Sequence, residues 1–217
     1  MIYDLIPLRS NEPSTLDYLN SRSKTYEICL ENECFDDAYV SAHIIFIYWL
    51  YCKVWALINY KPKLVNQIFA LHSFDSRYDR DKFLNSASAL ELCGLKLEER
   101  KYAEVFGALC LSRDDVKILK NLIDVRNHIL HPSGLIKYNS QSELDEIFKS
   151  QELIAKKIAE FMAPKYIDLI KNTYGKVSYY KVLRWEVDYE LEQSLFTKYH
   201  LSNIDLIAIK GFLRANR

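Results

Sequence analysis

The feature that most constrains the fold is a long apolar segment without glycine or proline, AYVSAHIIFIYWLYCKVWALI, at residues 38–58. It is much longer than the roughly 4–8 residues of a buried strand, so it predicts a helix. Ser41, His43 and Lys53 interrupt the segment. Its longest clean run, Ile44–Cys52, is far below the roughly 18 residues that span a bilayer. The segment therefore predicts a helix buried at the centre of a domain or at an interface.

Composition indicates a helical fold for the rest of the chain. Its 217 residues include only five glycines and five prolines, too few for the turns of an all-β sandwich. The formal net charge is zero, so a nucleic acid would have to bind at a local basic patch. The first residues, MIYDLIPLRS, contain no basic region that leads into an apolar one, so we expect no secretory signal. The cysteines match no zinc spacing, so we expect reduced thiols in the core. Reduced thiols are typical of a cytoplasmic protein, and we expect no membrane association. The cysteines are Cys29, Cys34, Cys52, Cys93 and Cys110.

Helix start and stop residues divide the chain into a series of helices and leave no convincing strand, so we expect an all-α fold. Serine followed three residues later by aspartate forms a capping box, and this pattern begins helices at Ser112, Ser142 and Ser202. Pro164 is expected to kink or end the second of these helices, and Gly175 to end a helix. The expected helices cover about 13–31, 38–60, from 62 onward, 81–92, 97–110, 112–130, 142–164, 178–199 and from 202 onward.

The helix that begins at Ser112 is amphipathic, with one exception. A helical wheel places Ile118, Leu119, Leu122, Ile123, Val125, Ile129 and Leu130 in one half. Arg126 falls near the middle of that apolar half, where an unpaired guanidinium is costly. Two explanations remain open: an ion pair with a carboxylate of another helix, such as Glu27 or Glu31, or an anion bound in a cleft or subunit interface.

The end of this helix carries the sequence RNHILHP, residues 126–132. Proline disfavours helical geometry in the residue before it, so His131 is expected at the helix terminus, where its imidazole can turn toward Arg126. Asn127 lies on the same side of the helix as His131, four residues away. The pattern therefore combines a fixed arginine, a polar neighbour and a histidine at the helix end.

Arg126, Asn127 and His131 in this context resemble the Arg-polar-x-x-x-His signature of the HEPN superfamily. The resemblance covers about residues 13–163, and it implies a HEPN-like antiparallel helical bundle at 1–163 with a C-terminal helical extension at 164–217 packed on the same domain. It also implies a metal-independent endoribonuclease that acts as a homodimer on RNA, often as a toxin or antiviral effector with a cognate antitoxin. Its catalytic residues would be Arg126, Asn127 and His131. The alternative is a non-catalytic HEPN-like module for binding or dimerisation.

Other polar residues are weaker candidates. His128 is either an auxiliary residue or an exposed histidine without a role. Asp124, His128 and His131 lack the spacing of a zinc helix, so we expect no metal and no other cofactor. His43, within the apolar segment, is expected to be a hydrogen-bonded core residue. A basic stripe, which would be either a solvated face or a track for the RNA backbone, consists of Arg113, Lys117 and Lys120.

Overall fold

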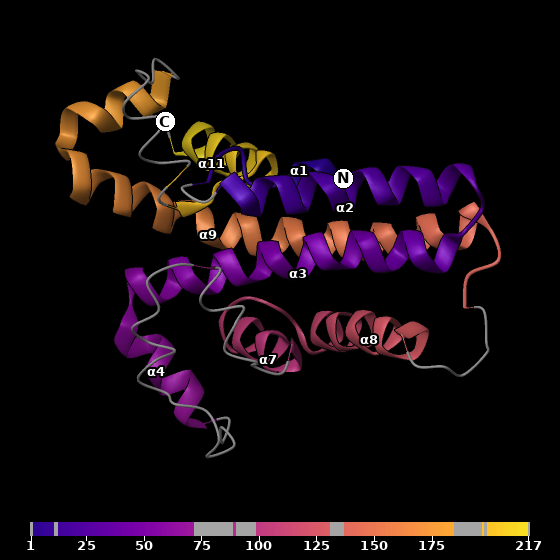
Figure 1. The fold of residues 1–217 in the computed structure, drawn as a ribbon. Helices are drawn as coiled ribbons and strands as arrows, with labels where there is room; N and C mark the ends of the chain where they lie inside the picture. Colours follow the sequence, from indigo (N-terminus) through magenta and orange to yellow (C-terminus); the bar gives the residue numbers. More distant parts are fainter. Residues whose placement is uncertain are drawn as a thin grey trace.

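The computed structural model describes residues 2–10, 13–71, 89, 99–130, 137–184, 197 and 199–216. This part of the chain is helical and contains no strand, which confirms the expected all-α class. The helices, shown in Figure 1, are α1 Ile2–Leu5, α2 Pro13–Glu31, α3 Phe35–Tyr60, α4 Pro62–Leu71, α7 Glu99–Leu109, α8 Arg113–Leu130, α9 Gln141–Arg184 and α11 Asn203–Ala215. The helix expected at 81–92 lies outside the described residues, apart from Ala89.

Helices α2 and α3 form an antiparallel hairpin. Glu33 turns the chain between them in the left-handed conformation, with a φ of 58°. Backbone bonds close the turn, including one from the Cys34 amide to the Cys29 carbonyl at 2.8 Å. This geometry ends a helix by satisfying its last carbonyls, and it explains why the chain can reverse here without a glycine.

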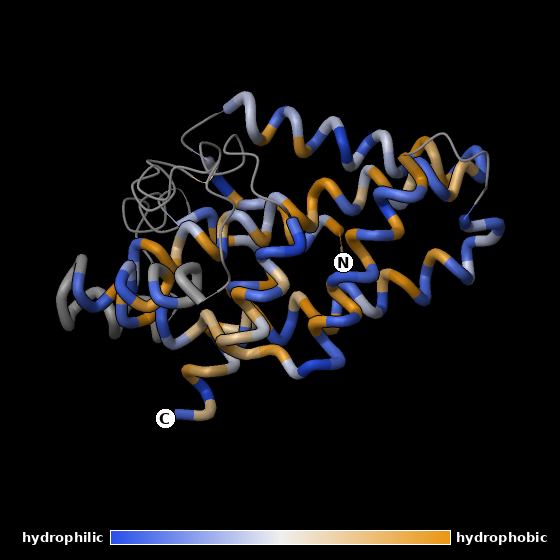
Figure 2. Tube along the Cα trace, turned by 90° about the horizontal axis from the view of Figure 1, so that it is seen from below, coloured by the Kyte–Doolittle hydropathy of each residue, from blue (hydrophilic) through white to orange (hydrophobic). Residues whose placement is uncertain are grey.

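Helix α3 lies at the centre of the fold, as its apolar sequence predicts. It packs against α1, α2, α4, α7, α8 and α9, and α2 and α9 run alongside it in Figure 1. The helix is long and apolar enough to cross a membrane, but 89% of its most apolar window is buried within the fold. Hydrophilic and hydrophobic residues alternate along the helices that surround it (Figure 2). Helix α3 is therefore the core around which amphipathic helices pack.

A buried ion pair joins α3 to α11. Lys53 and Asp205 are both fully buried and form this pair directly. The Lys53 ammonium also donates to the Tyr166 hydroxyl at 3.2 Å, and the Trp49 indole donates to the Ser202 hydroxyl at 3.1 Å. Buried charges are tolerated only when they are paired and hydrogen-bonded. The polar residue at position 53 of the apolar segment therefore attaches the C-terminal helix to the core.

Two of the three predicted capping boxes are confirmed. The Ser112 hydroxyl accepts from the Asp115 amide at 3.2 Å, and Asp115 accepts from the Ser112 amide at 3.0 Å. Ser202 and Asp205 make the same reciprocal bonds. The box predicted at Ser142 is wrong, because α9 already begins at Gln141. Ser140 accepts from the Glu143 amide at 3.3 Å instead.

Helix α9 contradicts the helix end predicted at Gly175 and one of the two alternatives predicted at Pro164, a helix end. It runs without interruption from Gln141 to Arg184, so neither Pro164 nor Gly175 ends a helix. Proline removes only one backbone donor, and the strongly apolar face before it remains buried, including Ile158, Met162 and Ala163. The division of the chain at 163/164 stays a prediction, and α9 passes through it.

The described cysteines are free thiols, and they differ in environment. Cys52 is buried, as expected, and burial raises its pKa to about 12. Cys29 and Cys110 are half-buried, and Cys34 is exposed in the turn after α2. The prediction of core thiols is therefore correct for Cys52 and wrong for Cys34, whose position in a short polar turn keeps it at the surface.

Acid should destabilise the fold partly through His200. This residue is buried beside Trp55, with ring centroids 5.7 Å apart. Burial, and then the charge of Lys53, lower its pKa to about 4, below the value of about 6.5 in an unfolded chain. The stabilisation is therefore complete above pH 6.5 and is lost as the pH falls toward 4. Residue 200 has a φ of 49°, which asparagine tolerates. We therefore expect His200→Asn to make the decrease in unfolding free energy at low pH smaller by up to about 3 kcal/mol.

Urea unfolding at pH 7 and pH 4.5 measures this effect. The difference in unfolding free energy between the two pH values should be smaller for His200→Asn than for the wild type. An equal difference in both proteins would show that other groups cause the acid sensitivity.

Candidate functional site

The site predicted from the sequence lies at the C-terminal end of α8. The wheel is confirmed along most of this helix, since Leu119, Leu122, Ile123 and Val125 are buried. These side chains pack inside the same chain. The same face of α8 also bears Arg126 and Leu130. Only the last turn of this face, with Arg126 half-buried and Leu130 57% exposed, reaches the surface.

Helix α7 lies antiparallel to α8 and brings its own charges to the site. Arg100 pairs with Asp124, and Lys120 pairs with Glu104 at 3.2 Å. Gly107 permits close contact at the other end, because a Cβ there would lie only 2.6 Å from the Val116 side chain. This packing sets the first turn of α7 beside the last turn of α8.

Arg126 forms an ion pair with Glu99, the first residue of α7. The exposed fractions of the two side chains are 22% and 21%. An ion pair with another helix was one of the two explanations considered for Arg126, but the predicted partners are wrong. Glu27 instead accepts a hydrogen bond from Tyr3 of α1.

His43 completes a cluster with Glu99 and Arg126. The residue is 1% exposed, and its Nε2 lies 3.9 Å from the Glu99 Oε2. Its Nδ1 lies 3.4 Å from the Tyr39 hydroxyl, which donates to the Leu122 carbonyl of α8 at 2.6 Å. His43 is therefore a buried core histidine, as expected, and it also faces the predicted site.

The cluster changes the protonation of its members. Burial lowers the pKa of His43, and the nearby Arg126 adds to this effect while Glu99 opposes it. Burial alone would raise the pKa of Glu99, but the His43 ring and the Arg126 guanidinium together lower it. At neutral pH the cluster thus contains an ionised pair, Glu99 with Arg126, beside an uncharged imidazole.

The remaining motif residues have different environments. Asn127 is half-buried, and His128 is exposed. The His128 Nδ1 lies 2.8 Å from the Asp124 carbonyl, so it donates to the backbone of its own helix. His131 lies outside the described residues, as does Pro132. The position of the third motif residue relative to Arg126 stays a prediction.

The basic stripe is partly neutralised by neighbouring carboxylates. Lys117 lies 3.4 Å from Asp114 on the same helix, and Lys120 pairs with Glu104 of α7. Arg113 is exposed at the start of α8. Because exposed pairs of this kind are weak, Lys117 and Arg113 keep the capacity to bind phosphates.

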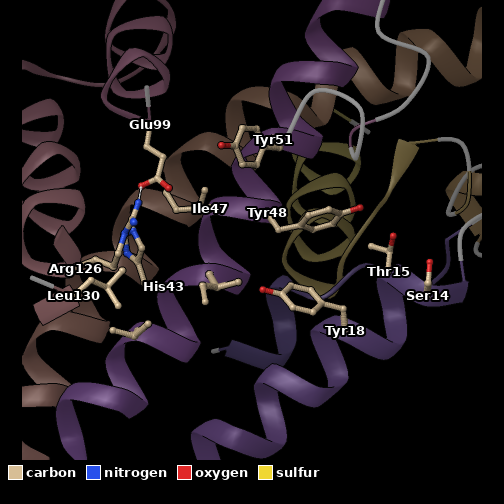
Figure 3. Close-up of a pocket in the computed structure, with 12 residues that line it drawn as sticks. Ser14, Thr15, Tyr18, His43, Ile47, Tyr48, Tyr51, Glu99, Arg126 and Leu130 are labelled. Atoms are coloured by element: carbon tan, nitrogen blue, oxygen red, sulfur yellow. Dashed lines mark ion pairs between the residues drawn. The ribbon is translucent and has the colours of Figure 1, made fainter. Parts of the chain in front are cut away.

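A pocket of about 390 Å³ opens beside the cluster. Arg126, His43 and Glu99 meet at one end, and Ser14 and Thr15 lie at the other, with Tyr18 and Tyr48 between them (Figure 3). The lining comes from α2, α3, α7 and α8 and also includes Val40, Ile44, Ile47, Tyr51 and Leu130. A mostly apolar pocket with a few polar groups is typical of small-molecule sites.

Sequence reasoning missed Glu99 and the pocket. An acidic residue in the first turn of a helix is favoured by the helix dipole alone, so nothing in the sequence marks Glu99 as a partner of Arg126. The pocket face of α3 is also hidden, because Val40, Ile44, Ile47 and Tyr51 belong to a segment that is apolar on all sides. Only the polar exception at His43 indicated that this part of α3 differs from an ordinary core.

Comparison of the chain with protein-family models, with curated proteins and with solved structures finds no match.

Proposed function

We propose that the protein is a metal-independent endoribonuclease of the HEPN type. The observation that carries the proposal is the position of Arg126, a half-buried arginine in the last turn of α8, beside a pocket and five residues before the motif histidine in the sequence. A guanidinium has five N–H donors. The ion pair with Glu99 engages Nη2, so the other two nitrogens can donate to a phosphate.

RNA supplies its own nucleophile, the 2′-hydroxyl, so the protein needs a base, an acid and positive charge. Histidine can serve as base or acid near neutral pH. His131 takes this role, Arg126 holds the phosphate, and Asn127 orients His131 or the substrate. Each chain contributes one motif histidine. A two-fold dimer supplies a second His131 to the same cleft.

The biological setting follows from the resemblance to the HEPN superfamily. The protein would act in the cytoplasm as a toxin or antiviral effector, with a cognate antitoxin or regulatory protein as its partner. Arg113, Lys117 and Lys120 would contact the RNA backbone. Their partial pairing with Asp114 and Glu104 predicts modest affinity for RNA that depends strongly on salt.

A second function is favoured by one specific contact. Glu99 already neutralises Arg126, and an arginine paired with a carboxylate of another helix has a structural role that requires no catalysis. The protein would then be a non-catalytic HEPN-like module for binding or dimerisation.

Cleavage products distinguish the two functions. Attack by the 2′-hydroxyl requires no divalent ion, so the purified protein should cleave single-stranded RNA in excess EDTA and leave 2′,3′-cyclic or 3′-phosphate ends. DNA of the same sequence should remain intact, because it lacks the nucleophile. Gel electrophoresis and mass spectrometry of the products measure both results.

Contrary results would identify another mechanism or none. Products with 5′-phosphate ends that require magnesium would indicate a hydrolytic metal mechanism. Intact RNA at high protein concentration, with or without magnesium, would favour the non-catalytic module.

A further inference from the structure

We propose that the pocket between α2, α3, α7 and α8 binds one unstacked nucleobase of the RNA, next to the phosphate held by Arg126. The identity of the ligand rests on the proposed function, whereas the site itself rests on the pocket. The pocket volume of about 390 Å³ falls in the range of small-molecule sites, roughly 300–1,000 Å³. It can admit a single base and excludes a duplex.

One buried polar atom at the Arg126 end of the pocket lacks a hydrogen-bond partner among the described residues. His43 is 1% exposed, and its Nε2 has no hydrogen-bond partner among the described residues. The contact with Glu99 at 3.9 Å is too long for a hydrogen bond. A buried polar atom without a partner is rare and costly. A ligand with a polar edge would supply the missing partner, and a purely apolar ligand would not.

The charges at this end favour an uncharged ligand. Glu99 and Arg126 form an ion pair, so together they add no net charge to the pocket. Between them they offer acceptors and donors, and His43 offers a ring nitrogen. The edge of a nucleobase carries both donors and acceptors in one plane and is neutral, so it matches the groups at this end of the pocket. The Arg126 nitrogens outside the ion pair with Glu99 remain for the neighbouring phosphate.

The walls of the pocket suit a flat aromatic ring. Tyr18 of α2 and Tyr48 of α3 lie between the two polar ends (Figure 3), and Tyr51 adds a third aromatic side chain. Proteins hold unstacked RNA bases by stacking them on aromatic rings and bonding their edges. Tyr18 is 47% exposed, so its ring is accessible to an incoming base.

Binding to uncleavable RNA tests the proposal. The probes are two fluorescent 2′-O-methyl tetranucleotides, one with all four bases and one abasic at every position, measured by fluorescence anisotropy. Both carry the same phosphates, and neither has a 2′-hydroxyl. Because stacking contributes roughly fivefold to 150-fold per base, the wild type should bind the base-containing probe about tenfold more tightly or better.

Variants test whether the pocket causes the preference for the base-containing probe. Tyr18→Ala, at an exposed position, and Ile44→Trp, which fills the pocket, should each reduce the preference to less than twofold. Tyr3→Ala is a matched control, since Tyr3 is also 47% exposed but does not line the pocket, and it should keep the full preference. If circular dichroism shows that Ile44→Trp does not fold, the affinities of Tyr18→Ala for the two probes test the proposal without it.

The outcomes separate this proposal from the proposed function. Base-dependent binding that requires Tyr18 supports the pocket even where no RNA is cleaved. Equal affinity for the two probes, or a preference that survives in Tyr18→Ala, overturns the pocket proposal even where RNA is cleaved normally.

Discussion

Replacing His131 with alanine should lower the rate of RNA cleavage by a factor of about 100 to 10,000, the usual contribution of a general acid or base. In the proposed mechanism each chain supplies a single motif histidine, so the dimer would lose both proton-transfer groups at once. Pro132 predicts that His131 is at the end of the helix and outside the core, so the substitution should leave the fold intact. Cleavage under single-turnover conditions and a thermal unfolding curve measure the two effects.

His128→Ala is the matched control for this experiment. Its ring is exposed and bonded to the Asp124 carbonyl of its own helix, so it should reduce cleavage by less than about fivefold, which corresponds to roughly 1 kcal/mol. Equal losses for the two histidines would contradict the assignment of His131. Full activity of His131→Ala would contradict it more strongly, because no other motif residue can transfer protons.

Replacing Lys53 with methionine should cost about 3–5 kcal/mol of unfolding free energy, the typical effect of removing one partner of a buried ion pair. Methionine has a similar shape, so the change mainly removes the charge. The Asp205 carboxylate would then remain fully buried without its cation. Urea unfolding followed by circular dichroism measures the loss.

Two controls define the cause of this loss. Lys117→Met removes an exposed lysine whose ion pair with Asp114 lies at the surface, and it should change stability by less than about 1 kcal/mol. The double variant Lys53→Met with Asp205→Asn should recover part of the loss, because no unpaired charge remains in the core. A loss below about 1 kcal/mol for Lys53→Met would show that the pair contributes no more than a surface contact.

The sequence predicted the helices whose ends carry strong local markers. Pro13, Pro62, Ser112 and Ser202 mark helix starts through interactions with residues no more than four positions away. The periodicity of residues 113–130 likewise identified the buried face of α8, because burial of an amphipathic helix follows from its own sequence.

Predictions failed where a local marker competed with packing. Pro164 lowers helix propensity, but the apolar residues around it, such as Met162, Ala163 and Tyr166, are buried and outweigh this effect. The helix also continues through Gly175 to Arg184. At the start of α9, Ser140 and Ser142 are both acceptable caps by residue type. The preference for Ser140 depends on the chain before it, where the Lys137 and Tyr138 amides donate to Asp36 of α3 at 2.9 Å.

The candidate site was predictable only in part for a similar reason. Helical periodicity showed that Arg126 needed a partner, but it contains no information on which carboxylate supplies one. Glu99 is 27 residues away in the sequence, and the antiparallel packing of α7 on α8 brings it close. A pocket built from four helices depends on the same tertiary packing, so no local pattern reveals it.

The distance in sequence between Lys53 and Asp205 has a consequence for folding during synthesis. A ribosome would make α3 long before it makes α11, so the nascent chain must carry Lys53 without its counter-ion while about 150 residues are added. Burial of an unpaired ammonium is strongly unfavourable. The hairpin of α2 and α3 can form early, but the centre of the core closes around Lys53 only after Asp205 has left the exit tunnel.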